Sequence, residues 1–302
     1  MKRKLQTLFL AYLEKSSMAE IRLEHVSYRY SPDTPFEKVA LQDIDLSFTP
    51  GKITGVIGHT GSGKSTLAQL LNGILRPTEG RVLLDGEELF VNAKSRHAAR
   101  FRVGLVFQYP EYQLFEETVF QDIAFGPKNR GKSNEEIQRL VEEAAHFTGV
   151  EPDLMDKSPF ELSGGQKRRV AIAGVLAMDP EVLVLDEPAA GLDPSGREEI
   201  LGRLVTYQRE RGKTVLLISH SMEDVARFAD ELLVLKEGTA FLHDTVEKVF
   251  SDPEKLTEAH LALPQITRLI LDLKARGIPV PASVHTVSDA LFLLKKLLKE
   301  GT

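Results

Sequence analysis

The sequence predicts an α/β fold in which a mostly parallel sheet is covered by helices, with a small antiparallel layer beside it. The first observation is that short, continuous apolar runs alternate with longer helical patterns, and such runs are typical of strands buried on both faces. They lie at residues 53–57, 103–107, 182–185, 215–218 and 232–235. The second is that residues 21–28 and 44–48 alternate apolar and polar side chains, as strands with one solvent-facing side do.

The rest of the chain is predicted to be helical. Strand patterns disappear between residues 112 and 161, where 134–148 has helical spacing, so we expect a helical insertion at about 110–168. Beyond residue 246 apolar residues again recur at helical spacing, in two segments separated by Pro279-Val280-Pro281. We therefore expect an N-terminal extension (1–20), a sheet domain (21–245) and a C-terminal helical domain (246–302).

Composition excludes several classes of site. The 302 residues carry 38 Lys and Arg against 44 Asp and Glu, and this net charge of -6 gives no overall attraction to nucleic acid, so no nucleic-acid partner is expected. The absence of cysteine excludes disulfides, thiolate metal sites and cysteine nucleophiles. No apolar run approaches the roughly 20 residues that a membrane-spanning helix requires.

The N-terminus has some features of a signal peptide. Three basic residues follow Met1, and a short apolar stretch follows them, but it is interrupted by polar residues and followed at once by Glu14-Lys15. We interpret residues 1–20 as an amphipathic or disordered extension, with Met18 as an alternative start.

Residues 58–66 read GHTGSGKST, which fits the phosphate-loop pattern G-x-x-x-x-G-K-[ST]. Glycines let the loop turn its N–H groups toward phosphate oxygens, and the N-terminus of the following helix, expected at 65–72, adds positive potential. A strand precedes the loop, as this mechanism requires. The predicted nucleotide contacts are Gly58, His59, Thr60, Gly61, Ser62, Gly63, Lys64, Ser65 and Thr66, with Lys64 reaching the terminal phosphates and Ser65 holding Mg²⁺.

Polar residues follow two further predicted strands. Asp186 and Glu187 end the apolar run 182–185, and His220 comes just after 215–218. Because ligands of open α/β sheets bind at the carboxyl ends of strands, Asp186 falls where Mg²⁺ would lie and Glu187 where a water could be polarised for attack on a phosphate. The alternative is that the two acids only cap the next helix, and that His220 is an ordinary surface residue.

The motif Leu162-Ser163-Gly164-Gly165-Gln166 precedes a predicted helix at 167–178. Chance occurrence of this pattern in a chain of this length is about one in two thousand, which makes coincidence with the other motifs untenable. Ser163 and the two glycine N–H groups would form a second anion site at a helix N-terminus. This second anion site would duplicate the phosphate loop at 58–66 unless it binds another nucleotide.

Together with Gln108, Gly191-Leu192-Asp193 and His220, these motifs resemble the nucleotide-binding subunits of ATP-binding cassette transporters over roughly residues 21–245. The resemblance implies ATP and Mg²⁺ as cofactors and a head-to-tail dimer in which two nucleotides lie between the phosphate loop of one subunit and the LSGGQ motif (162–166) of the other. Gln166 and the neighbouring Ser163, Gly164 and Gly165 would then contact a partner's nucleotide.

The same resemblance implies roles for single residues. Tyr30 would stack on adenine, with Tyr28 as the alternative, and Gln108 would sense Mg²⁺ and the attacking water. Glu187 would be the general base, His220 would contact the γ-phosphate, and Asp193 would link the two sites.

The segment 109–129, YPEYQLFEETVFQDIAFGPKN, is similar to the ATPases of energy-coupling factor transporters, and most to the second of their two ATPase paralogues. That resemblance implies a peripheral subunit on the cytoplasmic face of the cell membrane, driving import of vitamins or other micronutrients. Its partners would be a second ATPase, a paralogue or an identical chain, a transmembrane coupling (T) subunit and substrate-binding (S) subunits. The exposed aromatics expected at Tyr112 and Phe115 would line a groove for helices of the membrane partner, unless Phe115 and Val119 only pack the insertion's core.

Three alternatives remain. One is the ATPase of an importer fed by a solute-binding protein, against which segment 109–129 argues. Another is a soluble ATPase of translation or DNA repair, which would show two cassettes or a long coiled coil. The third is a regulatory ATP-binding module without turnover, which the presence of Glu187 and His220 disfavours. The family also implies that the C-terminal segment helps to hold two ATPase subunits together, although its apolar helices fit packing on their own ATPase domain equally well.

Overall fold

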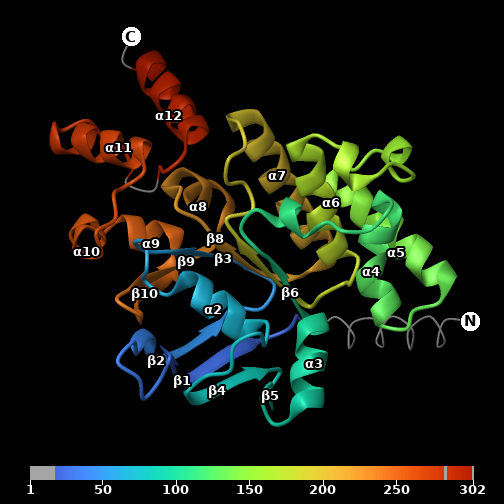
Figure 1. The fold of residues 1–302 in the computed structure, drawn as a ribbon. Coiled ribbons are helices and arrows are strands. Elements are labelled where there is room, and N and C mark those ends of the chain that lie inside the picture. Colours follow the sequence, from blue (N-terminus) through green and yellow to red (C-terminus); the bar gives the residue numbers. More distant parts are fainter. Residues whose placement is uncertain (1–17, 282–283, 301–302) are drawn as a thin grey trace, which may run out of the picture.

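The computed structural model describes residues 18–281 and 284–300, and the predictions for residues 1–17 lie outside this range. Two sheets lie one above the other, with helices between, behind and beside them (Figure 1). The larger sheet has six strands, and all except the edge strand β10 run parallel. In spatial order they are β10 (Thr239–Thr245), β9 (Glu231–Lys236), β3 (Ile53–Ile57), β8 (Thr214–Ile218), β7 (Val182–Asp186) and β6 (Val103–Val106).

All five predicted parallel strands are present, and their bounds differ by at most one residue from the predicted ranges. Every residue of β3, β6, β7 and β8 is buried, as continuous apolar runs lead one to expect. β10 was not predicted. Its residues are partly buried or exposed and pair antiparallel with β9 at the sheet edge, so its sequence lacks an apolar run.

The antiparallel layer is larger than predicted. It contains four strands in the order β2 (Lys38–Phe48), β1 (Ile21–Tyr30), β4 (Glu79–Leu84) and β5 (Glu87–Glu88). β2 begins six residues before the predicted strand, because pairing with β1 extends it through residues whose pattern does not alternate. Helix α2 (Lys64–Leu71) packs its apolar side chains into one core with both sheets, whereas α3 (Ala93–Arg102), which was not predicted, contributes only Ala99 to this core.

Helices fill the chain between β6 and β7. After a short 3₁₀ turn (Pro110–Gln113) come α4 (Val119–Asn129), α5 (Asn134–Thr148) and α6 (Gly164–Leu176), which pack on one another and on the sheet. The predicted helix 134–148 is confirmed. Helix α6 begins three residues before its predicted start, because Ser163 and Gln166 form a capping box at its N-terminus. Val119 is fully buried in this core, whereas Phe115 is 58% exposed.

The remaining helices follow the last strands. α7 (Pro194–Arg211) leads to β8, and α8 (Met222–Phe228) leads to β9. Beyond β10 come α9 (Val246–Phe250), α10 (Pro253–Glu258), α11 (Gln265–Ala275) and α12 (Val287–Glu300). α9 and α10 pack on the sheet, while α11, α12 and the segment between them share a separate small core of Ile270, Val280, Val284 and Ala290.

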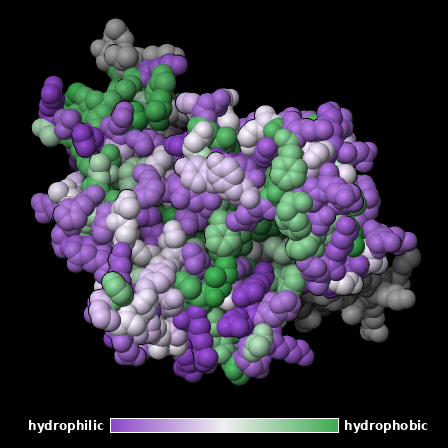
Figure 2. All heavy atoms as spheres, viewed as in Figure 1, coloured by the Kyte–Doolittle hydropathy of each residue, from purple (hydrophilic) through white to green (hydrophobic). Residues whose placement is uncertain are grey.

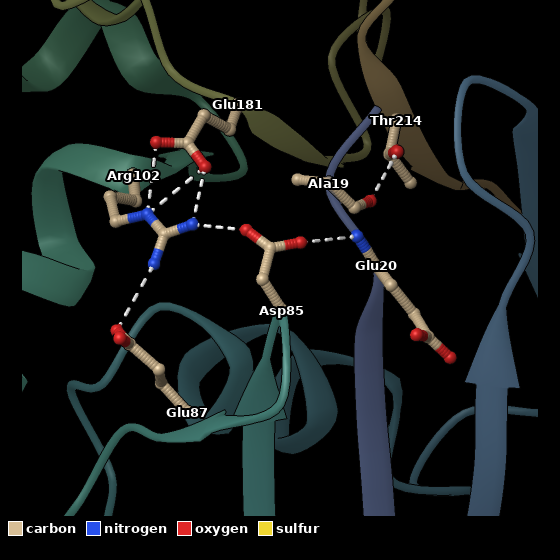
Figure 3. Close-up of polar contacts among 7 residues, drawn as sticks. All are labelled: Ala19, Glu20, Asp85, Glu87, Arg102, Glu181 and Thr214. Atoms are coloured by element: carbon tan, nitrogen blue, oxygen red, sulfur yellow. Dashed lines mark hydrogen bonds and ion pairs between the residues drawn. The ribbon is translucent and has the colours of Figure 1, made fainter. Parts of the chain in front are cut away.

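A polar cluster joins the layers at the edge of the parallel sheet where its strands begin (Figure 3). The guanidinium of Arg102, the last residue of α3, donates to both carboxylate oxygens of Glu181, and it also contacts Asp85 in the β4–β5 turn. Asp85 in turn accepts a hydrogen bond from the Glu20 amide at 3.0 Å, just before β1. The cluster thus ties both sheets together, on the side away from the carboxyl ends of the parallel strands. Within the described part of the chain, no helix is long and apolar enough to cross a membrane.

Candidate nucleotide-binding site

Four parallel strands deliver the predicted site residues to one edge of the sheet. The phosphate loop follows β3, Glu187 follows β7, His220 follows β8 and Gln108 follows β6. Because these strands are neighbours and point the same way, their carboxyl ends converge. Here a cavity of about 260 Å³ is lined by Tyr30, Lys38, Ala40, Thr60, Gly61, Gly63, Lys64, Ser65, Thr66, Gln108, Asp186, Glu187 and His220.

At two positions of the phosphate loop the backbone leaves no room for a side chain. Gly63 has φ 105°, and a Cβ built on it would lie 2.6 Å from the carbonyl oxygen of Ala40. At Gly58 a Cβ would lie 2.4 Å from the carbonyl oxygen of Leu235. No side chain caps the N-terminus of α2, so its first N–H groups remain available to an anion at the positive end of the helix dipole.

Lys64 folds back over this loop. Its Nζ donates to the carbonyl oxygens of Gly58 at 2.7 Å and His59 at 3.0 Å, and only 6% of the residue is exposed. Burial lowers the pKa of Lys64, whereas the nearby carboxylates of Glu187 and Asp186 raise it. A cation held in this way is poised to exchange its carbonyl contacts for phosphate oxygens.

The two carboxylates at the end of β7 differ in their surroundings. Burial raises the pKa of Asp186, and the Ser65 hydroxyl and the Lys64 ammonium, which line the same cavity, partly offset this rise. Burial, and then repulsion from Asp186, raise the pKa of Glu187 to about 7. Glu187 Oε1 is buried without a hydrogen bond and lies 3.6 Å from Nε2 of His220. A carboxylate with a pKa near neutrality is suited to accept a proton.

The donor set fits a Mg²⁺ ion that arrives with a nucleotide. The Ser65 hydroxyl and the Asp186 carboxylate line the same cavity, and oxygen ligands of this kind are what Mg²⁺ prefers. Among the described residues, no group of three or more His, Asp or Glu side chains is placed to hold a metal ion. A Mg²⁺ ion here would therefore need phosphate oxygens as further ligands. One or two protein oxygens plus phosphates are the usual Mg²⁺ site in nucleotide-binding proteins.

Tyr30 lies at the mouth of the cavity. Its hydroxyl is 3.1 Å from Thr66 Oγ1, its ring meets Tyr28 edge to face at a centroid distance of 4.9 Å, and 38% of the residue is exposed. Tyr30 lines the cavity and Tyr28 does not, so the geometry favours Tyr30 as the ring that a nucleotide base would meet. Gly58, His59 and Ser62, predicted as contacts, belong to the loop but do not line this cavity.

The LSGGQ residues do not reach this first cavity. Ser163 caps α6, accepting from the Gln166 amide at 3.4 Å, while its own amide donates to Gln166 Oε1 at 2.9 Å. Gly165 instead lines a second cavity of about 480 Å³ together with Asp193, whose carboxylate caps α7 through the Gly196 amide at 2.7 Å. The predicted site residues therefore form two separate groups, each at a helix N-terminus.

Comparison with known proteins agrees with this geometry. The family described as "ABC transporter" matches residues 41–190. Over 89% of the chain, 51% of residues are identical to the energy-coupling factor transporter ATP-binding protein EcfA2 of Caldanaerobacter subterraneus subsp. tengcongensis, of which 94% is covered. The EcfA2 protein of Clostridium perfringens is 48% identical over 93% of the chain, with 99% of that relative covered. The chain belongs to the energy-coupling factor transporter ATP-binding proteins. It is therefore an ABC-type ATPase whose activity is coupled to transport.

Solved structures place this energy-coupling factor ATPase in the same fold. The structure of cbiO1 from Clostridium perfringens, described as part of the ABC transporter complex cbiONQ, has a TM-score of 0.71 and 41% identity. It covers 83% of this chain, and 98% of cbiO1 is covered. The ATP-binding cassette MJ0796, solved as a dimer bound to ADP and Pi, has a TM-score of 0.67 and 27% identity, with 75% of this chain and 98% of that chain covered. The predicted P-loop α/β fold is confirmed.

Sequence reasoning missed three residues of this energy-coupling factor ATPase that bear on the site. Lys38 and Ala40 line the first cavity, but they lie in the part of β2 that was not predicted. Arg168 lines the second cavity and is only 3% exposed, which is unusual for an arginine. A run of three basic residues, 167–169, was the signal available, but sequence alone does not show which of them is buried.

Proposed function

We propose that this chain is an ATP-hydrolysing energy-coupling subunit of an importer for vitamins or other micronutrients, working with a second ATPase, a transmembrane T subunit and substrate-binding S subunits. The observation that carries the proposal is the identity of about half of all residues with proteins named energy-coupling factor transporter ATP-binding proteins, along nearly the whole chain. The two separate cavities at helix N-termini support it, because in the proposed dimer each would need the partner's site to enclose a nucleotide.

In the proposed catalytic cycle, ATP binds in the first cavity with its phosphates on the loop 58–66 and its base against Tyr30. Lys64 would bind the terminal phosphates, and Ser65, Gln108 and Asp186 would hold Mg²⁺, which would neutralise phosphate charge. Glu187 accepts a proton from the attacking water, and His220 contacts the γ-phosphate. The high pKa of Glu187 and its place beside His220 support this assignment.

The second cavity would face a partner ATPase. Ser163, Gly164, Gly165 and Gln166 would contact the nucleotide held by the partner's phosphate loop, and Asp193 would link the two sites. The solved dimer of MJ0796 supports such a pairing. ATP binding would close the two ATPases on each other, and hydrolysis would release them.

The helical region between β6 and β7 offers a surface for the membrane partner. Tyr112 is 84% exposed and Phe115 58% exposed, and the Phe115 ring meets Phe125 edge to face at a centroid distance of 4.9 Å. Exposed aromatic side chains beside one another are typical of a docking site for an amphipathic helix. Contact here would hold the chain at the cytoplasmic face of the membrane.

Mass spectrometry of proteins that co-purify with this chain from detergent-solubilised host membranes tests the proposal. A second ATPase, one transmembrane subunit and one or more small substrate-binding membrane proteins are expected. A conventional permease pair with a solute-binding protein would overturn the importer class and leave the ATPase in place. Loss of the membrane proteins from a Tyr112→Ala, Phe115→Ala variant, with retention of the second ATPase, is expected if these aromatics form the docking surface.

A further inference from the structure

Arg168 makes a buried, bidentate ion pair with Glu111. Its Nη2 lies 2.6 Å from Glu111 Oε1 and its Nε 3.0 Å from Oε2, and the two side chains are 4% and 15% exposed. Parallel N–H donors on a carboxylate fix both groups in orientation as well as position. The pair joins the second turn of α6 to the 3₁₀ turn that follows Gln108.

The same guanidinium contacts two other parts of the site. Nη1 of Arg168 donates to the carbonyl oxygen of Ala190, in the turn that begins at Glu187, and the group lies 5.9 Å from the centre of the Tyr109 ring. The Ala190 amide in turn donates to the Glu187 carbonyl at 3.1 Å. One side chain therefore connects the helix of the LSGGQ motif, the segment after Gln108 and the turn after Glu187.

Two of these segments contain a strained backbone. Glu187 has φ 52° and Tyr109 has φ 55°, in the left-handed region that non-glycine residues rarely adopt. Such conformations persist only where surrounding contacts hold them. Arg168 supplies contacts to both segments, through Ala190 on one side and through Glu111 and the Tyr109 ring on the other.

We propose that Arg168 is a positioning residue for ATP hydrolysis. Through its pairing with Glu111 and its bond to Ala190, it holds Glu187 and Gln108 in their mutual arrangement, and it transmits movement of the exposed segment around Tyr112 to the turn that carries Glu187. This inference rests on the proposed role of Glu187 as the general base. Arg168 does not line the first cavity, so it would act on hydrolysis there through the residues that it contacts.

The test compares Arg168→Lys, Glu111→Gln and the double variant in the purified complex with the second ATPase. Lysine keeps the charge but loses the bidentate geometry and the simultaneous reach to Ala190. We expect turnover per bound nucleotide to fall about 10-fold to 100-fold in each single variant, because small misplacements at a reacting centre have effects of this size. The dissociation constant for ATP should stay within about threefold, and the double variant should be no slower than the slower single variant.

Turnover is counted per bound nucleotide because molecules that fail to fold bind none, so a purely structural role would leave this ratio unchanged. A matched pair is Arg211→Lys with Glu143→Gln, an ion pair of 2.8 Å that joins α7 to α5 away from the first cavity. These controls should keep wild-type turnover.

The outcomes separate this inference from the proposed function. If wild-type complex hydrolyses ATP and Glu187→Gln abolishes that activity, the proposed function holds. Arg168→Lys and Glu111→Gln variants that then match the controls, or whose effects multiply in the double variant, would overturn the positioning role alone. If Glu187→Gln retains full turnover, the role of Glu187 fails first.

Discussion

At the scale of single residues, Glu187 stands out because one of its carboxylate oxygens is buried and has no hydrogen-bond partner. We expect Glu187→Gln to bind ATP like the wild type and to lose about 100-fold to 10,000-fold in turnover, the usual contribution of a general base. Single-turnover hydrolysis and nucleotide binding, measured on the same preparation, check this. Glu142→Gln, an exposed acid on α5, is the matched control. Wild-type-like hydrolysis by the Glu187→Gln variant would remove Glu187 from the mechanism.

The raised pKa of Glu187 predicts two pH dependences. Since the base must be ionised, kcat/KM should rise through pH 7. The folded-state pKa of about 7 exceeds the ordinary value of 4.5, so the folded protein binds this proton more tightly than the unfolded chain. The free energy of unfolding therefore falls as the pH rises from about 4.5 to about 7. The Glu187→Gln substitution should thus raise the free energy of unfolding by on the order of 3 kcal/mol at pH 8 and change it hardly at all at pH 4. If the substitution changes the melting temperature equally at pH 4 and pH 8, the pKa of Glu187 is not raised as described.

At the scale of elements, strands buried on both faces were predictable because such strands appear in the sequence as continuous apolar runs. β3, β6, β7 and β8 are such strands, and they position every catalytic candidate. β5 and β10 were not predictable, because they lie at sheet edges and are formed by pairing rather than by an apolar pattern. For the same reason Lys38, in the irregular first part of β2, was missed. The burial of Arg168 depends on three segments that only the fold brings together.

The phosphate loop contains two glycines that differ in the space available to a Cβ atom, so substituting each by alanine gives a matched comparison. Gly61 and Gly63 both have positive φ, 83° and 105°, but a Cβ on Gly61 meets open space, whereas one on Gly63 would lie 2.6 Å from the Ala40 carbonyl oxygen. Gly61→Ala should lower the free energy of unfolding by about 1 to 2 kcal/mol through strain alone. Gly63→Ala should lower it by about 3 kcal/mol or more, because the backbone of β2 must also move.

Thermal unfolding of the nucleotide-free protein, followed by ATP titration, measures both effects. Gly63→Ala should also weaken ATP binding, since shifting the loop misaligns the N–H groups at the start of α2. Equal destabilisation by the two substitutions would show that the contact with Ala40 contributes nothing.

At the scale of the whole molecule, the described residues form two separate cavities at helix N-termini and a C-terminal region with exposed apolar side chains. Figure 2 shows apolar side chains gathered over α11 and α12, at one extremity of the molecule. Val287, Leu291 and Phe292 are 60%, 49% and 76% exposed, although the small core beneath α12 buries Ala290. α12 packs against α11 and the segment before it, in a core separate from that of the sheets, and contact of its exposed face with a second ATPase subunit stays a prediction.

This division predicts a separable defect. Leu291→Glu with Phe292→Glu places two charges on the exposed face and leaves the buried Ala290 side untouched, so the chain should fold and bind ATP normally. Association with the second ATPase should weaken, because each buried apolar side chain contributes about 1.5 to 3 kcal/mol. Analytical ultracentrifugation of the two co-expressed ATPases measures the change, with Lys94→Glu, an exposed position on α3, as the control. If the doubly substituted complex stays intact at micromolar concentration, α12 contributes nothing to the contact and the phosphate-loop and LSGGQ faces alone hold the dimer.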